Sequence, residues 1–255
     1  MCLIFISVQE HPQYKLVIAA NRDEFYQRKT APASYWHDHP EILGGRDLEA
    51  QGTWMAMNKN GRIAMVTNYR DIRNIKSVAP SRGALVTDYL LQSNAPEHYL
   101  RDVEEKGKAY NGFNLVVGSG EELWYNSNYR EGVHKLSPGL HGLSNHLLDT
   151  PWPKVERGLD KMRGIMKGSD LSIDSLFTVL FDDVIAPDDK LPDTGVGLER
   201  ERMLSSMFIK SPGYGTRCST VVLIDRNDHV QFSERVFNLQ TFSYTQQDFQ
   251  FDIGK

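Results

Sequence analysis

Residues 2–24 read CLIFISVQEHPQYKLVIAANRDE and contain the signal that decides the fold. Two apolar runs rich in β-branched residues, 2–8 and 15–20, flank the turn-forming segment EHPQY. Because neither run alternates with polar residues, the pattern predicts a β-hairpin that is buried on both faces. The strands of a hairpin are antiparallel, so the polar tetrad NRDE at 21–24, directly after the second run, is expected to lie near Cys2.

The rest of the chain alternates groups of strands with groups of helices. The dipeptide Asn60-Gly61 between two strand-like runs is a strong hairpin signal, and 133–136 and 140–144 are interpreted as a further strand pair. A long loop is expected over 183–199, and a frayed polar tail from about residue 245. The other predicted strands are 53–58, 62–69, 113–117, 122–126, 216–224 and 229–236, and the predicted helices are 84–92, 97–107, 153–167 and 172–181.

This order of elements indicates the fold class. Most strands are joined by hairpins rather than by crossover helices, which is typical of antiparallel sheets with helices packed outside them. Pro153 near the start of one predicted helix and Gly168 just after its end are the expected boundary residues. The sequence therefore predicts an α+β fold in a single domain, residues 1–255.

Composition excludes several function classes. The chain has 255 residues, 40% hydrophobic and 24% charged, with a formal net charge of -4, which argues against a broad surface for nucleic acid or anionic membranes. No apolar run approaches the roughly 20 residues of a membrane span, and the first residues lack the features of a signal peptide. With only two cysteines, a reducing compartment is expected. We therefore expect a cytoplasmic protein with a small-molecule ligand or substrate, and the oligomeric state stays open.

Cys2 is the first candidate for chemistry. A Met-Cys start permits removal of Met1, which would leave Cys2 with both a thiol and a free α-amine. The α-amine has a pKa of about 7.7–8.0, so nucleophile and base would lie on one residue. The alternative is that Cys2 is a small hydrophobic residue at the start of a buried strand, which is the more typical role of such a cysteine taken alone.

Four further side chains fit this chemistry. Arg22 would favour the thiolate, and Asp23 would orient the ammonium form of the amine. Asn68 and Asn145 could donate hydrogen bonds to a developing oxyanion. The alternatives are a salt bridge at a strand end for the charged pair and ordinary turn positions for the asparagines.

Arg217 is the last candidate, ahead of the apolar run 221–224. Strand alternation places Arg217 and Cys218 on opposite faces, so if Arg217 points at the site, Cys218 is a buried structural thiol. The His37-Asp38-His39 segment has no third ligand at useful spacing, which predicts a solvated loop and no metal site. No phosphate-binding loop or dinucleotide fingerprint is present in the sequence.

Taken together, these motifs resemble the NRDE family, also called the transport and Golgi organisation protein 2 family. The resemblance runs from residue 2 to roughly 225. It rests on Cys2, NRDE at 21–24, GGRD at 44–47, GTW at 52–54, TNYR at 67–70, SRG at 81–83, LSN at 143–145, LDTPWPKV at 148–155 and GTR at 215–217.

The resemblance implies an Ntn-hydrolase-like αββα sandwich, in which two antiparallel sheets lie between helices. Similar enzymes are the bile-salt hydrolases and penicillin V acylases, which use an N-terminal Cys, an Arg and an Asp on the next strand, two Asn for the oxyanion and a late Arg. Cys2, Asn68, Asn145 and Arg217 match that scheme. The acylases separate their Arg and Asp by three residues, and in that frame Asn21 and Glu24 stand where the pair is expected.

Two functions follow from the resemblance, and the sequence leaves both open. The first is an amidase that acts on small N-acyl amides and requires no cofactor. The second is a non-catalytic carrier of haem or a lipid-like ligand in the same cleft. A haem carrier needs an axial ligand and an apolar cleft, and His146 or the Cys2 thiolate could serve as that ligand.

Overall fold

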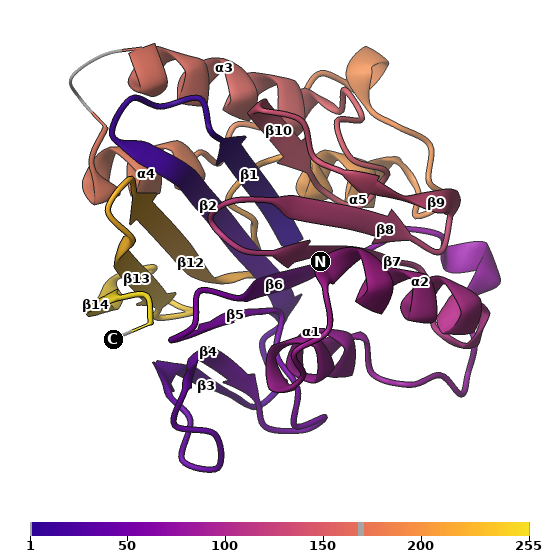
Figure 1. Ribbon diagram of the computed structural model, residues 1–255. Coiled ribbons are helices and arrows are strands. Elements are labelled where there is room, and N and C mark those ends of the chain that lie inside the picture. The colour runs from indigo at the N-terminus through magenta and orange to yellow at the C-terminus, as the bar shows by residue number, and fades with distance from the viewer. Residues whose placement is uncertain (1, 168–170, 255) are drawn as a thin grey trace.

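The protein is described by a computed structural model that covers residues 2–167 and 171–254. It is a four-layer αββα sandwich, as the family resemblance implied (Figure 1). Gly168, the expected boundary residue after one helix, and Met1 lie outside the described residues.

Both sheets are antiparallel, and each has seven strands. The first, sheet A, has the order β10-β1-β2-β12-β13-β14, with β11 paired to β12. Its strands are β1 (Cys2–Val8), β2 (Tyr14–Phe25), β10 (Gly139–Leu143), β11 (Lys210–Ser211), β12 (Tyr214–Asp225), β13 (His229–Phe237) and β14 (Tyr244–Asp252). The second, sheet B, runs in chain order through β3 (Thr30–Tyr35), β4 (Ile42–Asp47), β5 (Met55–Asn58), β6 (Ile63–Asn68), β7 (Phe113–Gly118), β8 (Leu123–Ser127) and β9 (Arg130–Lys135).

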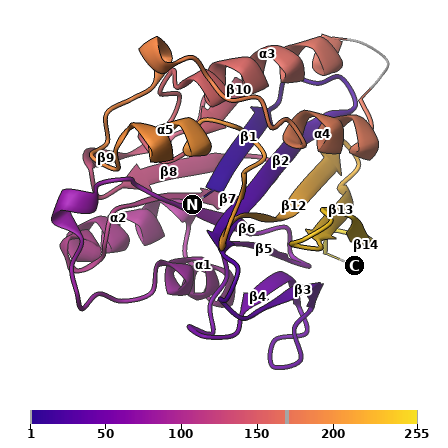
Figure 2. The ribbon, with the colours of Figure 1, turned by 180° about the vertical axis from the view of Figure 1, so that it is seen from behind.

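Helices cover the outer face of each sheet, as Figure 2 shows from behind. Sheet A is covered by α3 (Pro153–Lys167) and α4 (Ile173–Leu180), and sheet B by α1 (Arg82–Leu91) and α2 (Pro96–Lys106). The short helix α5 (Leu198–Leu204) and three 3-10 turns, η1 (Ile72–Asn74), η2 (Gly107–Ala109) and η3 (Asp188–Lys190), lie in the connections.

The first hairpin is buried on both faces, as predicted. In β1, Leu3 and Phe5 join the core under α3 and α4, whereas Ile4 and Ile6 join the core between the two sheets. Successive side chains of a strand point to opposite faces, so one short apolar run contributes to two cores. This explains why the run shows no polar alternation.

Several boundaries differ from the sequence-based expectations. The tetrad at 21–24 lies inside β2 rather than after it, because β2 pairs with β1 as far as Arg22 and with β12 as far as Phe25. The segments 133–136 and 140–144 are strands but not a pair, since β9 joins β8 in sheet B and β10 joins β1 in sheet A. The chain therefore crosses from sheet B to sheet A between β9 and β10.

Other differences concern segments that were assigned to loops or left unassigned. The tail does not fray: β14 pairs with β13 over nine residues, and Phe249 and Phe251 pack against the core. The expected loop 183–199 contains η3 and the start of α5. Strands β3 and β4 were not predicted, because their partly polar runs become strands only by pairing with the rest of sheet B.

Candidate active site

Cys2 is the first residue of β1, which lies between β10 and β2 in sheet A. The register places Cys2 opposite Arg22 on β2, and Arg22 opposite Cys218 on β12. Residues that lie directly opposite one another in a sheet share a face, so these three side chains form one row. Both cysteines are buried free thiols.

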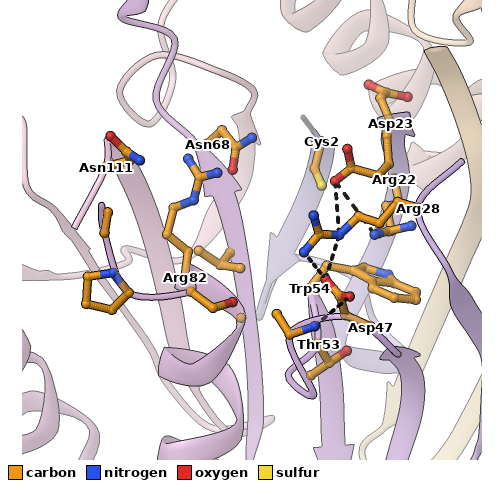
Figure 3. Close-up of a pocket in the computed structure, with 17 residues that line it drawn as sticks. Cys2, Arg22, Asp23, Arg28, Asp47, Thr53, Trp54, Asn68, Arg82 and Asn111 are labelled. Carbon is orange, nitrogen blue, oxygen red and sulfur yellow. Dashed lines mark hydrogen bonds and ion pairs between the residues drawn. The ribbon is translucent and has the colours of Figure 1, made fainter. Parts of the chain in front are cut away.

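The Cys2 sulfur points into a pocket of about 340 Å³ (Figure 3). One wall carries Arg22, Asp23 and Glu24 from β2, and the opposite wall carries Asn68 from β6 and Arg82 from the start of α1. The pocket is therefore polar and charged, and it opens where the ends of both sheets meet α1.

Two of the pocket arginines are held by neighbours. The Arg22 guanidinium lies 4.2 Å from the Trp54 ring centre and 3.8 Å from a Glu24 carboxylate oxygen. Arg28 donates a hydrogen bond of 2.8 Å to Asp47. Figure 3 shows the Arg22 guanidinium over the Trp54 ring on the same side of the pocket as Arg28 and Asp47.

Burial raises the pKa of the Cys2 thiol. Arg22 favours the thiolate, whereas the carboxylates of Asp23 and Glu24 disfavour it. Because the thiolate is the reactive form, this cysteine needs a base to take its proton.

Asp23 is buried at the end of the pocket. Its carboxylate accepts a hydrogen bond of 2.7 Å from the Thr216 hydroxyl. Burial raises the pKa of Asp23, and the nearby Lys154 ammonium opposes that rise. Lys154 itself is fully buried, and burial lowers the pKa of Lys154 to about 8.

The two asparagines have different positions. Asn68 lines the pocket, whereas Asn145 is fully buried behind it. The Asn145 side-chain amide donates a hydrogen bond of 3.0 Å to the Asn68 carbonyl, and its oxygen accepts one of 3.4 Å from Arg70. Asn145 therefore does not line the pocket, but contacts the backbone of Asn68, which does.

Three other predicted residues lie away from the pocket lining. Asn21 faces the helices of sheet A, where its amide donates hydrogen bonds to the carbonyls of Leu180 and Met207. His146 hydrogen-bonds with Thr150 at 2.9 Å and is half-buried.

Arg217 lies in a β-bulge of β12, where the register shifts between Thr216 and Cys218. Its guanidinium donates to the carbonyls of Phe25, Tyr26 and Arg28. Cys218, not Arg217, therefore joins the row of Cys2.

Sequence reasoning gave no role to several residues of this site, among them Trp54 and Arg82, which line the pocket, and Lys154, whose charge acts on Asp23. All three lie in motifs that supported the family resemblance. A signal for Lys154 was present: it lies in the first turn of a helix, where the helix dipole disfavours a cation, and next to Val155 on the apolar stripe that continues through Gly158 and Met162.

Neither a metal-binding cluster nor a membrane-spanning helix is found among the described residues. Across residues 2–167 and 171–254, no group of three or more His, Cys, Asp or Glu side chains could hold a metal ion. Within the same ranges, no helix is long and apolar enough to cross a bilayer.

The two paired antiparallel sheets and the outer helices form a fold of the Ntn-hydrolase type, which the family resemblance implied. A solved structure with this fold is the "mutant C2A conjugated bile acid hydrolase from Clostridium perfringens", which superposes with a TM-score of 0.53 over 99% of this chain and 92% of that chain at 9% identity. At this identity, the similarity concerns the fold alone.

Within this class, the chain belongs to the Transport and Golgi organisation 2 family, whose profile matches residues 1–239. A "Transport and Golgi organization protein 2 homolog" of Bos taurus is 37% identical over 257 residues, which cover 92% of this chain and 92% of the relative. The Homo sapiens homolog is 36% identical over 256 residues with the same coverage.

Proposed function

We propose that this protein is a cysteine-dependent amide hydrolase that acts on small N-acyl amides, with Cys2 as the nucleophile. The observation that carries the proposal is the Cys2 sulfur in a polar pocket beside Arg22 and Asp23. A volume of about 340 Å³ suits a small ligand. The raised thiol pKa requires a base, and the α-amine that removal of Met1 would leave on Cys2 supplies one.

In the proposed reaction, the thiol proton passes to the α-amine as the sulfur attacks the amide carbonyl carbon. The Asn68 side-chain amide donates a hydrogen bond to the resulting oxyanion. Asn145 holds Asn68 in place through its hydrogen bond to the Asn68 carbonyl. Collapse of the intermediate breaks the C–N bond, the departing amine takes the proton from the ammonium, and an acyl thioester remains on Cys2. Water then hydrolyses the thioester with the α-amine as base, which releases the acid and restores the thiol.

The haem or lipid carrier is the second candidate, and the pocket supports it less well. Its walls are dominated by charged and polar side chains, whereas haem favours an apolar cleft. His146 is hydrogen-bonded to Thr150 and does not line the pocket. Of the two proposed axial ligands, only Cys2 lies where a pocket ligand could reach it. Both cysteines are free thiols, as is typical of a reducing compartment, which supports a cytoplasmic location.

The test begins with the intact mass, which reports whether Met1 is removed. Wild type and Cys2→Ala are then incubated with a panel of N-acyl amides and with haem. We expect wild type to cleave at least one amide and to carry a transient acyl adduct on the Cys2 peptide, and Cys2→Ala to do neither while keeping its fold. Saturable, stoichiometric haem binding with no adduct at Cys2 from any amide would refute the hydrolase proposal.

A further inference from the structure

Arg82 is a cation in the pocket wall that the proposed reaction does not use. Its guanidinium donates a hydrogen bond of 3.0 Å to the Gly112 carbonyl, and it forms no ion pair within residues 2–167 and 171–254. Figure 3 shows this side chain next to Asn68, across the pocket from Cys2. A guanidinium is a planar fork of several N–H donors that matches a carboxylate. Arg82 therefore has donors left for a negatively charged group of a ligand.

The other two arginines that line the pocket are already paired. Arg28 lies 2.7 Å from an Asp47 carboxylate oxygen, and Arg22 lies 3.8 Å from one of Glu24. These contacts compensate both carboxylates within their own wall. An anionic group that enters the pocket is therefore expected to bind at Arg82, on the opposite wall.

A second pocket, of about 190 Å³, adjoins the first. The two pockets share three lining residues, which are Asn68, Arg82 and Asn111. Arg82 therefore lies at the border between them. A ligand whose carboxylate binds Arg82 can reach Cys2 on one side of this border and the second pocket on the other.

The second pocket offers an apolar surface. Tyr69, Ile72 and Ile75 line it, and the two isoleucines are 41% and 65% exposed. Its charged lining residues, Arg70 and Asp71, are both held by other side chains of the protein. Because covering exposed apolar surface is favourable, an apolar group of a ligand fits this pocket better than a charged one.

We propose that the substrate of this site is an N-acylated α-amino acid with a free carboxylate and an apolar side chain. This inference rests on the proposed function, which places the scissile amide carbonyl beside Cys2 and Asn68. In such a molecule, the carboxylate and the side chain branch from the carbon next to the amide nitrogen. Arg82 binds the carboxylate, and the side chain enters the second pocket towards Ile75.

The amino acid is then the leaving group of the proposed reaction. The bond between the acyl carbon and the amino-acid nitrogen breaks, and that nitrogen takes the proton from the ammonium of Cys2. Water releases the acyl group from the sulfur as a carboxylic acid. The products are one carboxylic acid and one free amino acid for each water consumed.

The test measures binding by calorimetry in Cys2→Ala, where no turnover occurs. N-acetyl-L-leucine is the ligand, N-isopentylacetamide lacks only its carboxylate, and N-acetylglycine lacks only its side chain. Arg82→Gln, Arg82→Lys and Ile75→Ala are each added to Cys2→Ala.

Two further variants in the same background are matched controls. Arg101→Gln changes an exposed arginine of α2 that is paired with Glu97. Val78→Ala changes a side chain that is 90% exposed, lies three residues after Ile75 and lines neither pocket. Wild type provides kcat/KM for the same three compounds.

We expect N-acetyl-L-leucine to bind at least about tenfold more tightly than N-isopentylacetamide, because a hydrogen bond between charged groups is lost in the latter. Arg82→Gln should abolish this preference, and Arg82→Lys should keep part of it. N-acetyl-L-leucine should also bind about tenfold more tightly than N-acetylglycine, and Ile75→Ala should reduce this second ratio. Both controls should keep both ratios, and kcat/KM of wild type should follow the same order.

Other outcomes overturn the inference. Equal affinity with and without the carboxylate, a preference that survives in Arg82→Gln, or no saturable binding of N-acetyl-L-leucine would each refute the role of Arg82. Equal affinity for the leucine and glycine compounds would refute the role of the second pocket. If Arg82→Gln does not fold, the comparison of ligands in Cys2→Ala alone still decides.

Failure of the proposed function gives a different result. If wild type cleaves none of the compounds but the binding preferences hold, the hydrolase proposal is wrong and the assignment of the ligand stands. If wild type cleaves N-isopentylacetamide as fast as N-acetyl-L-leucine, the hydrolase proposal stands and this inference is wrong.

Discussion

At the scale of single residues, the pocket separates groups that face the ligand from groups that hold them. Asn68 lines the pocket, whereas Asn145 is buried and bonds to the Asn68 carbonyl and to Arg70. A pocket-facing amide can be removed with little effect on folding. Removing a buried amide leaves its partners unsatisfied, at a cost of about 1–3 kcal/mol.

The two asparagines should therefore differ when each is replaced by alanine. We expect Asn68→Ala to lower the rate of Cys2 acylation by roughly 10²–10³ with unfolding free energy close to wild type. Asn145→Ala should lower both the rate and the stability, the latter by about 1–3 kcal/mol. Acylation kinetics and urea unfolding measure the two effects, and equal stability losses in both variants would contradict this division of roles.

Lys154 should also give stability a specific dependence on pH. Its pKa in the folded protein is about 8, against 10.5 as the ordinary value. Between these values the unfolded chain binds more protons at Lys154 than the folded chain, so the contribution of Lys154 to stability rises with pH. Relative to Lys154→Met, we expect wild type to gain on the order of 3 kcal/mol from pH 8 to pH 10.5. Urea unfolding of both proteins at pH 7, 8.5 and 10 measures the difference, and a constant difference would disprove the prediction.

At the scale of elements, the contact of α3 with β1 depends on Gly158. A Cβ added there would lie 1.9 Å from the Cζ atom of Phe5, a fully buried side chain. The missing side chain lets the helix approach the strand that carries Cys2. Since Lys154 lies one turn earlier on the same helix, this approach also sets how close Lys154 comes to the site.

Two glycine substitutions in α3 should therefore have opposite effects. Gly158→Ala should destabilise the protein by about 1–3 kcal/mol, because the added methyl group must displace Phe5. Gly164→Ala is the control, since a Cβ there meets no atom within 4 Å, and it should stabilise by about 0.5–1 kcal/mol through helix propensity. Thermal unfolding compares them, and a stabilising Gly158→Ala would show that α3 packs on β1 differently.

At the scale of the whole molecule, Glu234 connects the two sheets. This buried residue of β13 in sheet A accepts a hydrogen bond of 2.6 Å from the backbone N–H of Ala33 in β3 of sheet B. It also accepts one from Thr220 on β12 at 3.3 Å. Burial raises the pKa of Glu234 to about 7. The carboxyl group that connects the two sheets therefore changes its protonation near neutral pH.

The connection predicts how the folded molecule responds to pH. Between the ordinary pKa of 4.5 and about 7, the folded state binds more protons at Glu234 than the unfolded state, so this contribution to stability falls as pH rises. The stability of wild type relative to Glu234→Gln should thus decrease by on the order of 3 kcal/mol from pH 4.5 to pH 7. Urea unfolding of both proteins at pH 5, 6 and 7.5 measures this, and a difference that grows with pH would contradict it.

The sequence by itself determined the elements that depend on local pattern. Apolar runs and turn residues predicted the hairpin of β1 and β2 and the hairpin around Asn60-Gly61, and the motifs predicted the family. They also placed the tetrad 21–24 near Cys2, because the strands of a hairpin are antiparallel. This part of the site lies within 24 residues of chain and needs no distant partner.

Only the tertiary structure decided the rest. Strand β12 lies beside β2 and has a bulge at Arg217. This bulge places Cys218 in the row of Cys2. That α3 packs on sheet A buried Lys154 near Asp23. A one-residue shift of register exchanges the faces of a strand, and burial changes the pKa of a charged group without changing its sequence. Which side chains face Cys2, and in which protonation state, therefore follows from contacts between segments far apart in the chain, which local sequence patterns do not specify.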